Sequence, residues 1–252
     1  MSWKTHVDQG VATLTLDAPP LNILTRAVLA ELRTTLAALE ATPDLRVVRL
    51  VAAGKHFSAG ADVGEHLPPQ YEELIPEFCD TIERLARFPL PVVAAVRGRC
   101  LGGGFELAMA ADVIVAGEGA TFGQPEIVLG VTAPVACVIL PRLSQHGFAA
   151  ELLFAGDAVS STRARAAGVV QHVVADETVE DEALAICRRI ARHSGAALRA
   201  TKATLLDSAT KPLSEALRAA SDDYVTKLMK TEDALEGLNA FLEKRPAQWR
   251  HR

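Results

Sequence analysis

The sequence predicts an α/β fold in which strands and helices alternate around one large core. Short β-branched runs and amphipathic helical stripes follow one another through the first two-thirds of the chain. Of the 252 residues, 49% are apolar, which is enough to bury a sizeable core. From about Asp176 onward the pattern is helical throughout. We therefore expect repeated ββα units over residues 1–195 and a C-terminal helical segment over residues 196–252.

The first quarter of the chain is predicted to contain two strands and one helix. Val11–Asp17 alternates apolar and polar residues, which predicts a half-buried strand. Thr25 can cap a helix whose apolar residues recur at a spacing of about 3.6. That stripe consists of Val28, Leu29, Leu32, Leu36 and Leu39. Arg46–Ala52 is rich in β-branched residues and predicts another strand.

The next elements are a second amphipathic helix and a run of short strands. The helix is expected over Tyr71–Phe88. Its apolar face consists of Leu74, Phe78, Ile82 and Leu85. The expected strands are Val92–Val96, Asp112–Ala116, Thr121–Phe122 and Val169–Val174, with a turn at Gln124–Pro125–Glu126 before the helices that begin near Val135.

Four helices are expected after Asp176. They are Val179–His193, Ala197–Ser208, Leu213–Met229 and Asp233–Lys244. The third carries an apolar stripe of Leu213, Leu217, Ala220, Tyr224 and Leu228. Such a stripe could cover the core of its own domain or dock on a neighbouring subunit.

Composition limits the functional classes. The net charge of −5 gives no support for binding nucleic acid or an anionic membrane. The four cysteines are far apart and form no C-x-x-C pair, which argues against a zinc site or a disulfide framework. No apolar leader opens the sequence and no run of about 18 apolar residues occurs, so we expect neither secretion nor a membrane span. A reducing, cytoplasmic location is expected.

A glycine triplet, Gly102–Gly103–Gly104, follows the strand expected at Val92–Val96. Glycines let a ligand approach the main chain, and the first amides of a helix have no partners inside it. Such amides can hold a phosphate or the oxyanion of a polarised carbonyl. Neither G-x-G-x-x-G nor G-K-S/T occurs, which favours a carbonyl polariser over a nucleotide site. From the residues alone, a tight turn whose glycines serve packing remains the alternative.

Two glutamates accompany the triplet. Glu106 lies near the start of the expected helix, and Glu126 follows 20 residues later in a Gly-Gln-Pro-Glu turn. Two carboxylates close together in an apolar pocket repel each other, so they share one proton or one pKa rises. That combination supplies an acid and a base near neutral pH. Each could instead be a solvated surface residue, although the mostly apolar neighbours, FEL and QPEIVLG, argue against this.

The segments CLGGGFELAMAADVIVA, ATFGQPEIVLG and HFSAGADV resemble the enoyl-CoA hydratase/isomerase (crotonase) family. The resemblance extends from Gly10–Asn22 to the terminal FLEKRPAQW. It implies the ClpP/crotonase fold and an acyl-CoA hydratase that acts on a double bond conjugated to a thioester. It also implies homotrimers or homohexamers and no metal or other cofactor, because coenzyme A is part of the substrate.

The resemblance assigns roles to individual residues. The backbone N–H groups of Ala61 and Gly103 would form an oxyanion hole for the thioester oxygen. Glu106 would activate water, and Glu126 would protonate the α-carbon. The substrate-binding positions would be Ala59, Gly60, Asp62, Val63, Gly102, Pro125, Val131 and Pro134.

The sequence departs from the common family pattern at two places. After Gly130 it continues VTAPVAC where many members have Pro-Gly-Ala-Gly-Gly, and Gly64 stands where a lysine is frequent. The runs DVGEHLP and GVTAPVA look more like the branch of cyclohexa-1,5-dienecarbonyl-CoA hydratases. The first departure affects the shape of the acyl pocket, and the second affects one contact with coenzyme A.

Other functions and other residues remain as alternatives. An enoyl-CoA isomerase needs only one carboxylate, and a non-catalytic CoA- or RNA-binding homologue needs neither. No general base aligns with Cys100, so Cys100 is expected to be a small buried apolar residue. Either His56 or His66 could contact substrate, since they flank the Ala61 loop. Asp112 is expected to fix the backbone, whereas Lys244 and Arg245 could meet the CoA phosphates or remain solvated.

Overall fold

The computed structural model describes residues 1–251, and within them a six-stranded sheet has the order β1-β2-β3-β4-β6-β9. A smaller sheet has the order β5-β7-β8. The strands are β1 (Trp3–Asp8), β2 (Val11–Leu16), β3 (Val47–Ala52), β4 (Val92–Val96), β5 (Arg99–Leu101), β6 (Val113–Gly117), β7 (Thr121–Gly123), β8 (Val159–Ser160) and β9 (His172–Val174). In the large sheet β1 and β2 are antiparallel, and the pairs from β2 to β9 are parallel.

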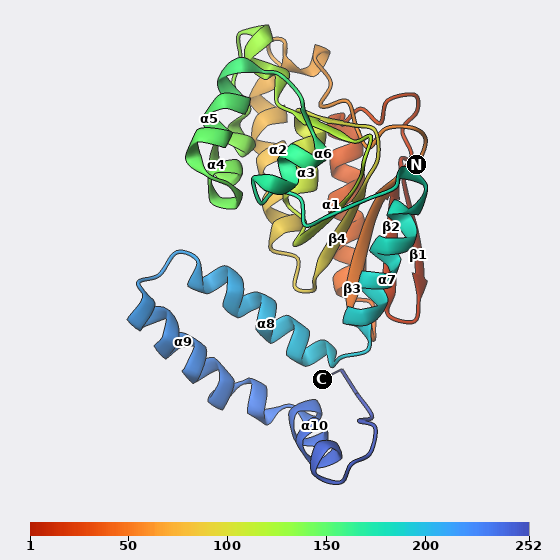
Figure 1. Ribbon diagram of the computed structural model, residues 1–252, viewed down its shortest axis with the longest axis vertical. Helices are drawn as coiled ribbons and strands as arrows, with labels where there is room; N and C mark the ends of the chain where they lie inside the picture. Colours follow the sequence, from red (N-terminus) through yellow and green to blue (C-terminus); the bar gives the residue numbers. More distant parts are fainter. Residues whose placement is uncertain (252) are drawn as a thin grey trace.

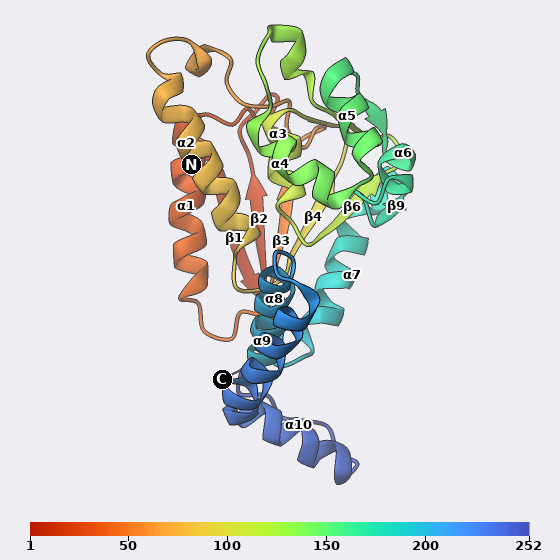
Figure 2. The same ribbon diagram turned by 90° about the vertical axis from the view of Figure 1, so that its left-hand side faces the viewer.

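Helices cover both faces of the large sheet (Figures 1 and 2). The α-helices are α1 (Arg26–Glu40), α2 (Tyr71–Ala86), α3 (Gly103–Met109), α4 (Pro134–Leu143), α5 (His146–Ala155), α6 (Ser161–Ala166), α7 (Val179–Ala191), α8 (Gly195–Ser208), α9 (Leu213–Thr226) and α10 (Glu232–Leu242). Short 3-10 helices are η1 (Gly64–His66), η2 (Pro125–Leu129), η3 (Asp176–Thr178) and η4 (Leu228–Lys230). The alternating α/β prediction is confirmed.

Alternation along each strand divides the apolar side chains between two layers. In β3, Val48 and Leu50 join the core formed with α1 and α2. Val47 and Val51 of the same strand face α7 on the other side. Because both faces are buried, the parallel strands are apolar almost throughout, as their sequences predict.

The two long helices form as their patterns predict. The Thr25 side chain accepts a hydrogen bond from the Val28 N–H at 3.2 Å and caps α1. All five stripe residues of α1 and all four of α2 are buried. Both helices therefore pack on the sheet through the faces that the 3.6-residue spacing identifies.

Two local predictions differ from the structure, and one strand is not predicted. The strand expected at Val169–Val174 begins only at His172, because the N–H groups of Val169 and Val170 bond to the Ala164 carbonyl at the end of α6. In the turn expected at Gln124–Glu126, only Gln124 precedes the 3-10 helix η2, and Pro125 and Glu126 belong to it. Strand β1 is missing from the sequence prediction because only Trp3 among its six residues is buried.

The C-terminal helices α8 to α10 extend away from the large sheet (Figure 1). The apolar stripe predicted for the second of them, α9, is open to solvent: Leu213 is 76% exposed, Leu217 is 62% exposed and Tyr224 is 53% exposed. In a single chain this stripe does not cover the core of its own domain. Among residues 1–251, no helix combines the length and apolar character needed to cross a bilayer.

One buried ion pair fastens α8 to the sheet. The Lys202 ammonium, on a side chain only 4% exposed, donates to Asp112 Oδ2 at 2.7 Å and to the Leu90 carbonyl at 3.1 Å. The same Asp112 oxygen accepts a hydrogen bond from the Val92 N–H at 2.7 Å, at the start of β4. Burial lowers the pKa of Lys202, whereas the Asp112 carboxylate opposes this. Asp112 thus fixes the backbone, as expected.

Candidate active site

The loop after β3 carries Ala61 toward the glycine triplet. Leu24 forms an isolated parallel bridge with Ala61, in which the Leu24 N–H bonds to the Gly60 carbonyl at 2.9 Å and the Asp62 N–H bonds to the Leu24 carbonyl at 3.2 Å. In a parallel bridge the central residue turns its own N–H to the opposite side. The Ala61 N–H therefore faces away from Leu24 and has no acceptor within residues 1–251.

At Gly102 and Gly103 neighbouring atoms leave little room for a side chain. Gly102 has φ 51°, and a Cβ at this position would lie only 2.6 Å from Glu126 Oε1. A Cβ at Gly103 would lie 3.2 Å from the Ala61 nitrogen, so the two main-chain segments almost touch. Because α3 begins at Gly103, its N–H has no partner inside the helix. The Ala61 and Gly103 amides are therefore neighbours, and neither N–H has an acceptor in the part of the chain that the structure describes, so both can bind one oxygen.

Glu106 lies one turn into α3 and is only 3% exposed. Its Oε1 accepts a hydrogen bond from the Ala136 N–H at 2.7 Å. Burial raises the pKa of Glu106 to about 8; the Ala136 and Val135 amides oppose this, and the Glu126 charge adds to it. Near neutral pH this carboxyl therefore holds a proton for much of the time.

Glu126 stands on η2, directly after Pro125. Burial raises its pKa above the ordinary value, whereas its own backbone N–H and the nearby His66 lower it. The buried Gln124 side chain lies against this carboxylate. In the orientation that satisfies both groups, its amide donates to Glu126 Oε2 at 3.0 Å and to Oε1 at 3.2 Å.

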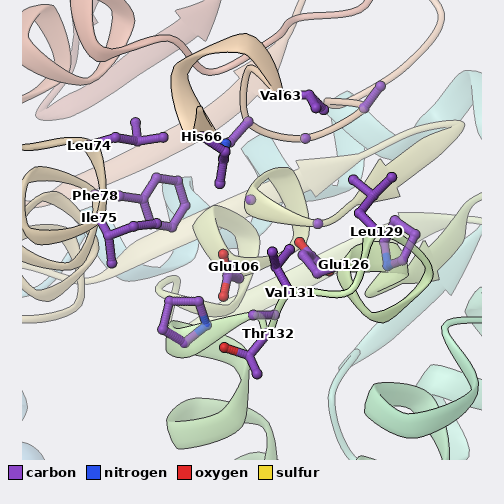
Figure 3. A pocket seen from close by; sticks show the side chains of 18 of the residues that line it. Val63, His66, Leu74, Ile75, Phe78, Glu106, Glu126, Leu129, Val131 and Thr132 are labelled. Carbon is purple, nitrogen blue, oxygen red and sulfur yellow. The ribbon is translucent and has the colours of Figure 1, made fainter. Parts of the chain in front are cut away.

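These groups meet in one cavity of about 240 Å³ (Figure 3). The residues predicted from the resemblance that line it are Ala59, Gly60, Ala61, Val63, Gly102, Gly103, Glu106, Pro125, Glu126, Val131 and Pro134. The remaining lining residues are His66, Leu67, Leu74, Ile75, Phe78, Leu129, Thr132 and Ala133. The cavity is apolar apart from two carboxyls, one imidazole, one hydroxyl and the backbone groups of the Ala61 and glycine segments.

The geometry can bind a carbonyl oxygen through two amides and present two carboxyl groups to the adjoining carbons. The sequence matches the enoyl-CoA hydratase/isomerase family over residues 6–252. The chain belongs to that family.

Three relatives are similar to this chain over nearly their whole length. A protein of Thauera aromatica named cyclohexa-1,5-dienecarbonyl-CoA hydratase is 38% identical over 250 residues, covering 97% of this chain and 95% of that protein. The 2,3-dehydroadipyl-CoA hydratase of Escherichia coli is 35% identical, covering 97% and 96%. The crystal structure of an enoyl-CoA hydratase from Bacillus anthracis superposes with a TM-score of 0.95 at 32% identity, covering 100% of both chains. The predicted crotonase-like fold is confirmed.

Asp62 differs from the other predicted substrate-binding residues because it does not line the cavity. Its Oδ1 accepts a hydrogen bond from the Glu65 N–H at 3.0 Å, and its carbonyl accepts one from His66 Nδ1 at 2.8 Å. Asp62 instead shapes the η1 turn that presents His66 to the cavity.

Sequence reasoning missed several members of the cavity wall. Leu74 and Phe78 belong to the apolar stripe of α2, and that stripe predicts burial without distinguishing core from pocket. Gln124 does not line the cavity, and its contact with the Glu126 carboxylate is not predicted, although it directly precedes the Pro125–Glu126 pair.

The other candidates fall outside the cavity, except His66. Cys100 is fully buried, and burial raises the pKa of its thiol well above the ordinary value, which argues against a nucleophile. His56 Nδ1 accepts a hydrogen bond from the Arg99 N–H at 3.1 Å and supports the start of β5. Arg245 pairs with Glu236 at 2.6 Å in the C-terminal segment, and the adjacent Lys244 is exposed. Residues 1–251 contain no cluster of three or more His, Cys, Asp or Glu side chains arranged to hold a metal.

Proposed function

We propose that this enzyme is a hydro-lyase that adds water across the double bond of an enoyl- or dienoyl-CoA thioester. The observation that carries the proposal is the meeting of two free amides, from Ala61 and Gly103, with two glutamates in one small cavity. Membership of the enoyl-CoA hydratase/isomerase family supports the same conclusion. The printed names of the Thauera and Escherichia relatives also describe hydratases of unsaturated acyl-CoA thioesters.

The oxyanion hole binds the thioester oxygen. Negative charge collects on this oxygen when water adds to the β-carbon, and the Ala61 and Gly103 N–H groups stabilise that charge. Removing one such donor from an enzyme typically raises the barrier by about 2.7–4 kcal/mol. The two donors come from separate loops, and a Cβ at Gly103 would lie only 3.2 Å from the Ala61 nitrogen, which supports a shared target.

The two glutamates move the protons. Glu106, as a carboxylate, accepts a proton from water while the water oxygen bonds to the β-carbon. Glu126, as the acid, gives its proton to the α-carbon. Glu106 then holds the proton and Glu126 is ionised, which matches the raised pKa of about 8 at Glu106. A water molecule between the carboxyls returns the proton to Glu126 for the next cycle.

This reaction is balanced without a metal or redox cofactor, since water and the acyl-CoA are its only reactants. An isomerase would shuttle one proton through a single carboxyl, and the second glutamate would have no task. The proposal therefore places hydration above isomerisation. Coenzyme A enters as part of the substrate.

The direct experiment is a spectrophotometric screen of linear, branched and cyclic enoyl-CoA thioesters. Hydration removes the conjugated double bond, so absorbance of the unsaturated thioester should fall when enzyme is added. A parallel assay with a 3-enoyl-CoA, in which conjugated absorbance rises, measures isomerisation. Isomerisation faster than hydration on every acyl group would refute the proposed reaction.

We expect a preference for short or cyclic acyl groups over long straight chains. Val131 and Pro134 line the cavity in a segment where many family members have glycines and a proline, and they stiffen and fill that wall. The cavity of about 240 Å³ also suits a compact group. Because an apolar misfit costs only about 1–3 kcal/mol per methylene, the preference should be graded. The measurement is kcat/KM for crotonyl-, decenoyl- and cyclohexadienecarbonyl-CoA.

A variant pair tests whether this wall causes the preference. Val131→Ala should raise kcat/KM for decenoyl-CoA relative to the cyclic substrate. Val128→Ala is the matched control, because Val128 is 73% exposed and does not line the cavity. A wild-type preference for decenoyl-CoA over both compact substrates would show that Val131 and Pro134 do not limit the pocket.

We also propose a homotrimer or homohexamer. The exposed apolar stripe of α9, on a helix that stands away from its own core, supports an interface with another copy. Light scattering at micromolar concentration should give a multiple of three subunits, and Leu217→Glu should shift the population toward smaller species. A stable wild-type monomer would contradict this. A cytoplasmic location fits the free thiols of all four cysteines.

A further inference from the structure

Ser58 is a fully buried polar residue three positions before Ala61, and the hydration steps above do not use it. It does not line the cavity. It forms an isolated parallel bridge with Cys100, the middle residue of β5, and β5 leads directly into the glycine triplet. The Ala61 loop and the glycine segment therefore meet at Ser58.

The Ser58 hydroxyl links two backbone groups of neighbouring loops. Its Oγ donates to the Asn22 carbonyl at 2.7 Å and accepts from the Gly60 N–H at 3.2 Å. One hydroxyl satisfies both groups, because it has one proton to donate and lone pairs that accept. Asn22 is itself fixed, since its side-chain amide donates to the Ala53 and His56 carbonyls, each at 2.9 Å.

The backbone N–H groups of residues 58–62 have acceptors, with one exception. The acceptors are the Arg99 carbonyl for Ser58 at 3.1 Å, the Leu21 carbonyl for Ala59 at 3.0 Å, the Ser58 hydroxyl for Gly60 at 3.2 Å and the Leu24 carbonyl for Asp62 at 3.2 Å. Among residues 1–251, only the Ala61 N–H of this segment lacks an acceptor. The other acceptors are main-chain carbonyls, so the Ser58 hydroxyl is the side-chain group on which this pattern depends.

Gly60 is the position at which the segment can most easily turn. Its φ of 122° is open to glycine and rarely to other residues. The Leu24 N–H holds the Gly60 carbonyl at 2.9 Å, and the Ser58 hydroxyl holds the Gly60 N–H. The N–H and C=O of one trans peptide point in opposite directions, so the Gly60 carbonyl sets the direction of the Ala61 N–H. Without the hydroxyl, the peptide group before Gly60 would lose this hydrogen bond.

Ser58 also contacts the segment that carries the second oxyanion donor. A Cβ at Gly104 would lie 2.5 Å from Ser58 Cβ and 2.6 Å from Ser58 Oγ, so the first turn of α3 packs directly on this side chain. The Leu101 N–H bonds to the Ser58 carbonyl at 3.0 Å, just before the triplet. Gly103 lies between these two contacts in the chain.

We propose that Ser58 is a positioning residue for hydration, whose hydroxyl orients the Ala61 N–H relative to the Gly103 N–H. The inference rests on the proposed function and adds the side chain that aligns the two oxyanion donors. Ser58→Ala would leave the Gly60 N–H and the Asn22 carbonyl without this partner. Loss of one oxyanion donor lowers kcat by about 10²–10³-fold, so misalignment of the Ala61 N–H should lower kcat toward that limit.

The decisive measurement follows the thioester carbonyl and does not depend on turnover. Butyryl-CoA has no double bond to hydrate. With ¹³C at its thioester carbon, its C=O stretch is recorded by isotope-edited infrared spectroscopy, free and bound. Hydrogen bonds to the oxygen lower this frequency, so it should fall on binding to the wild type and fall much less on binding to Ser58→Ala. An equal fall in both proteins would overturn the inference and leave the proposed function standing.

Ser161→Ala is the matched control. Ser161 is also fully buried, its Oγ donates to the Glu118 carbonyl at 3.0 Å, and it does not line the cavity. This variant should keep the wild-type carbonyl frequency and kcat. Equal changes in the two variants would overturn the inference, because loss of any buried hydroxyl would then suffice. A smaller fall in Ser58→Ala alone, in a protein whose wild type hydrates no enoyl-CoA, would support the positioning role and reject the proposed reaction.

A measurement on the wild type tests the inference even if Ser58→Ala does not fold. Amide hydrogen exchange should be slow at Gly60, whose N–H has an acceptor, and faster at Ala61. Exchange at Ala61 should slow when butyryl-CoA binds. Exchange at Gly60 as fast as at Ala61 would overturn the inference, because the hydroxyl would then not hold this peptide group. A wild-type carbonyl frequency that binding leaves unchanged would reject the oxyanion hole and the inference together.

Discussion

Replacing either Glu106 or Glu126 with glutamine is expected to lower kcat for hydration by about 10²–10⁴-fold, the range typical of general acid–base catalysis. Glutamine keeps the size of the side chain, and at position 106 its carbonyl can still accept from the Ala136 N–H. Binding of a saturated acyl-CoA, measured by calorimetry, should therefore remain nearly unchanged. Wild-type turnover in either variant would show that its proposed role is wrong.

The pH dependence gives this prediction a second readout. A pKa of about 8 at Glu106 means that the pair loses its shared proton as the pH rises through about 8. No acid then remains for the α-carbon, so wild-type kcat/KM should fall above that pH. Glu72→Gln is the matched control, since Glu72 is an exposed residue of α2 outside the cavity, and it should retain both the rate and the alkaline limb.

Gly102→Ala is expected to abolish most of the activity. Its φ of 51° lies where residues with a side chain are strained, at a cost of about 1–3 kcal/mol in stability. The added methyl would also meet Glu126 Oε1 at 2.6 Å, so either the carboxylate or the glycine segment must move. If the movement removes one oxyanion donor, kcat falls by about 10²–10³-fold. The measurement is kcat/KM per folded molecule, with the folded fraction taken from circular dichroism.

Gly54→Ala is the control that isolates backbone strain. Gly54 also has a positive φ, +81°, but a methyl there would meet no atom within 4 Å, and the residue does not line the cavity. It should lose stability of a similar order while each folded molecule keeps its activity. Equal losses of activity in the two variants would mean that strain, and not contact with Glu126, explains the effect.

Much of this arrangement follows from the sequence because it depends on local pattern. The stripes of α1 and α2 identify their buried faces, since a helix repeats every 3.6 residues regardless of what it packs against. The strand at Val92–Val96 is predicted at its observed bounds because all five of its residues are apolar and buried. The glycine triplet and the two glutamates can be assigned to one site because the segments that contain them each resemble the family closely.

The remaining features depend on contacts between distant segments. Leu74 and Phe78 appear as ordinary core residues until the η2 segment is brought opposite them. The proximity of Ala61 to Gly103 requires the bridge between Leu24 and Ala61, which no local pattern encodes. His66 likewise reaches the cavity only because the η1 turn, 60 residues before Glu126 in the chain, holds its Nδ1 against the Asp62 carbonyl.

The ion pair between Lys202 and Asp112 has a consequence for how the chain can be altered. Strand β4, which begins at Val92 beside this pair, leads through β5 to the glycine triplet. A truncation before α8 would remove Lys202. The Asp112 carboxylate, beside the start of β4, would then lack its cation. We therefore expect deletion or exchange of the C-terminal helices to disturb the start of β4, even though these helices contribute no residue to the cavity within residues 1–251. A shortened protein should retain the cavity residues, but its Gly103 N–H should be held less firmly in position and direction.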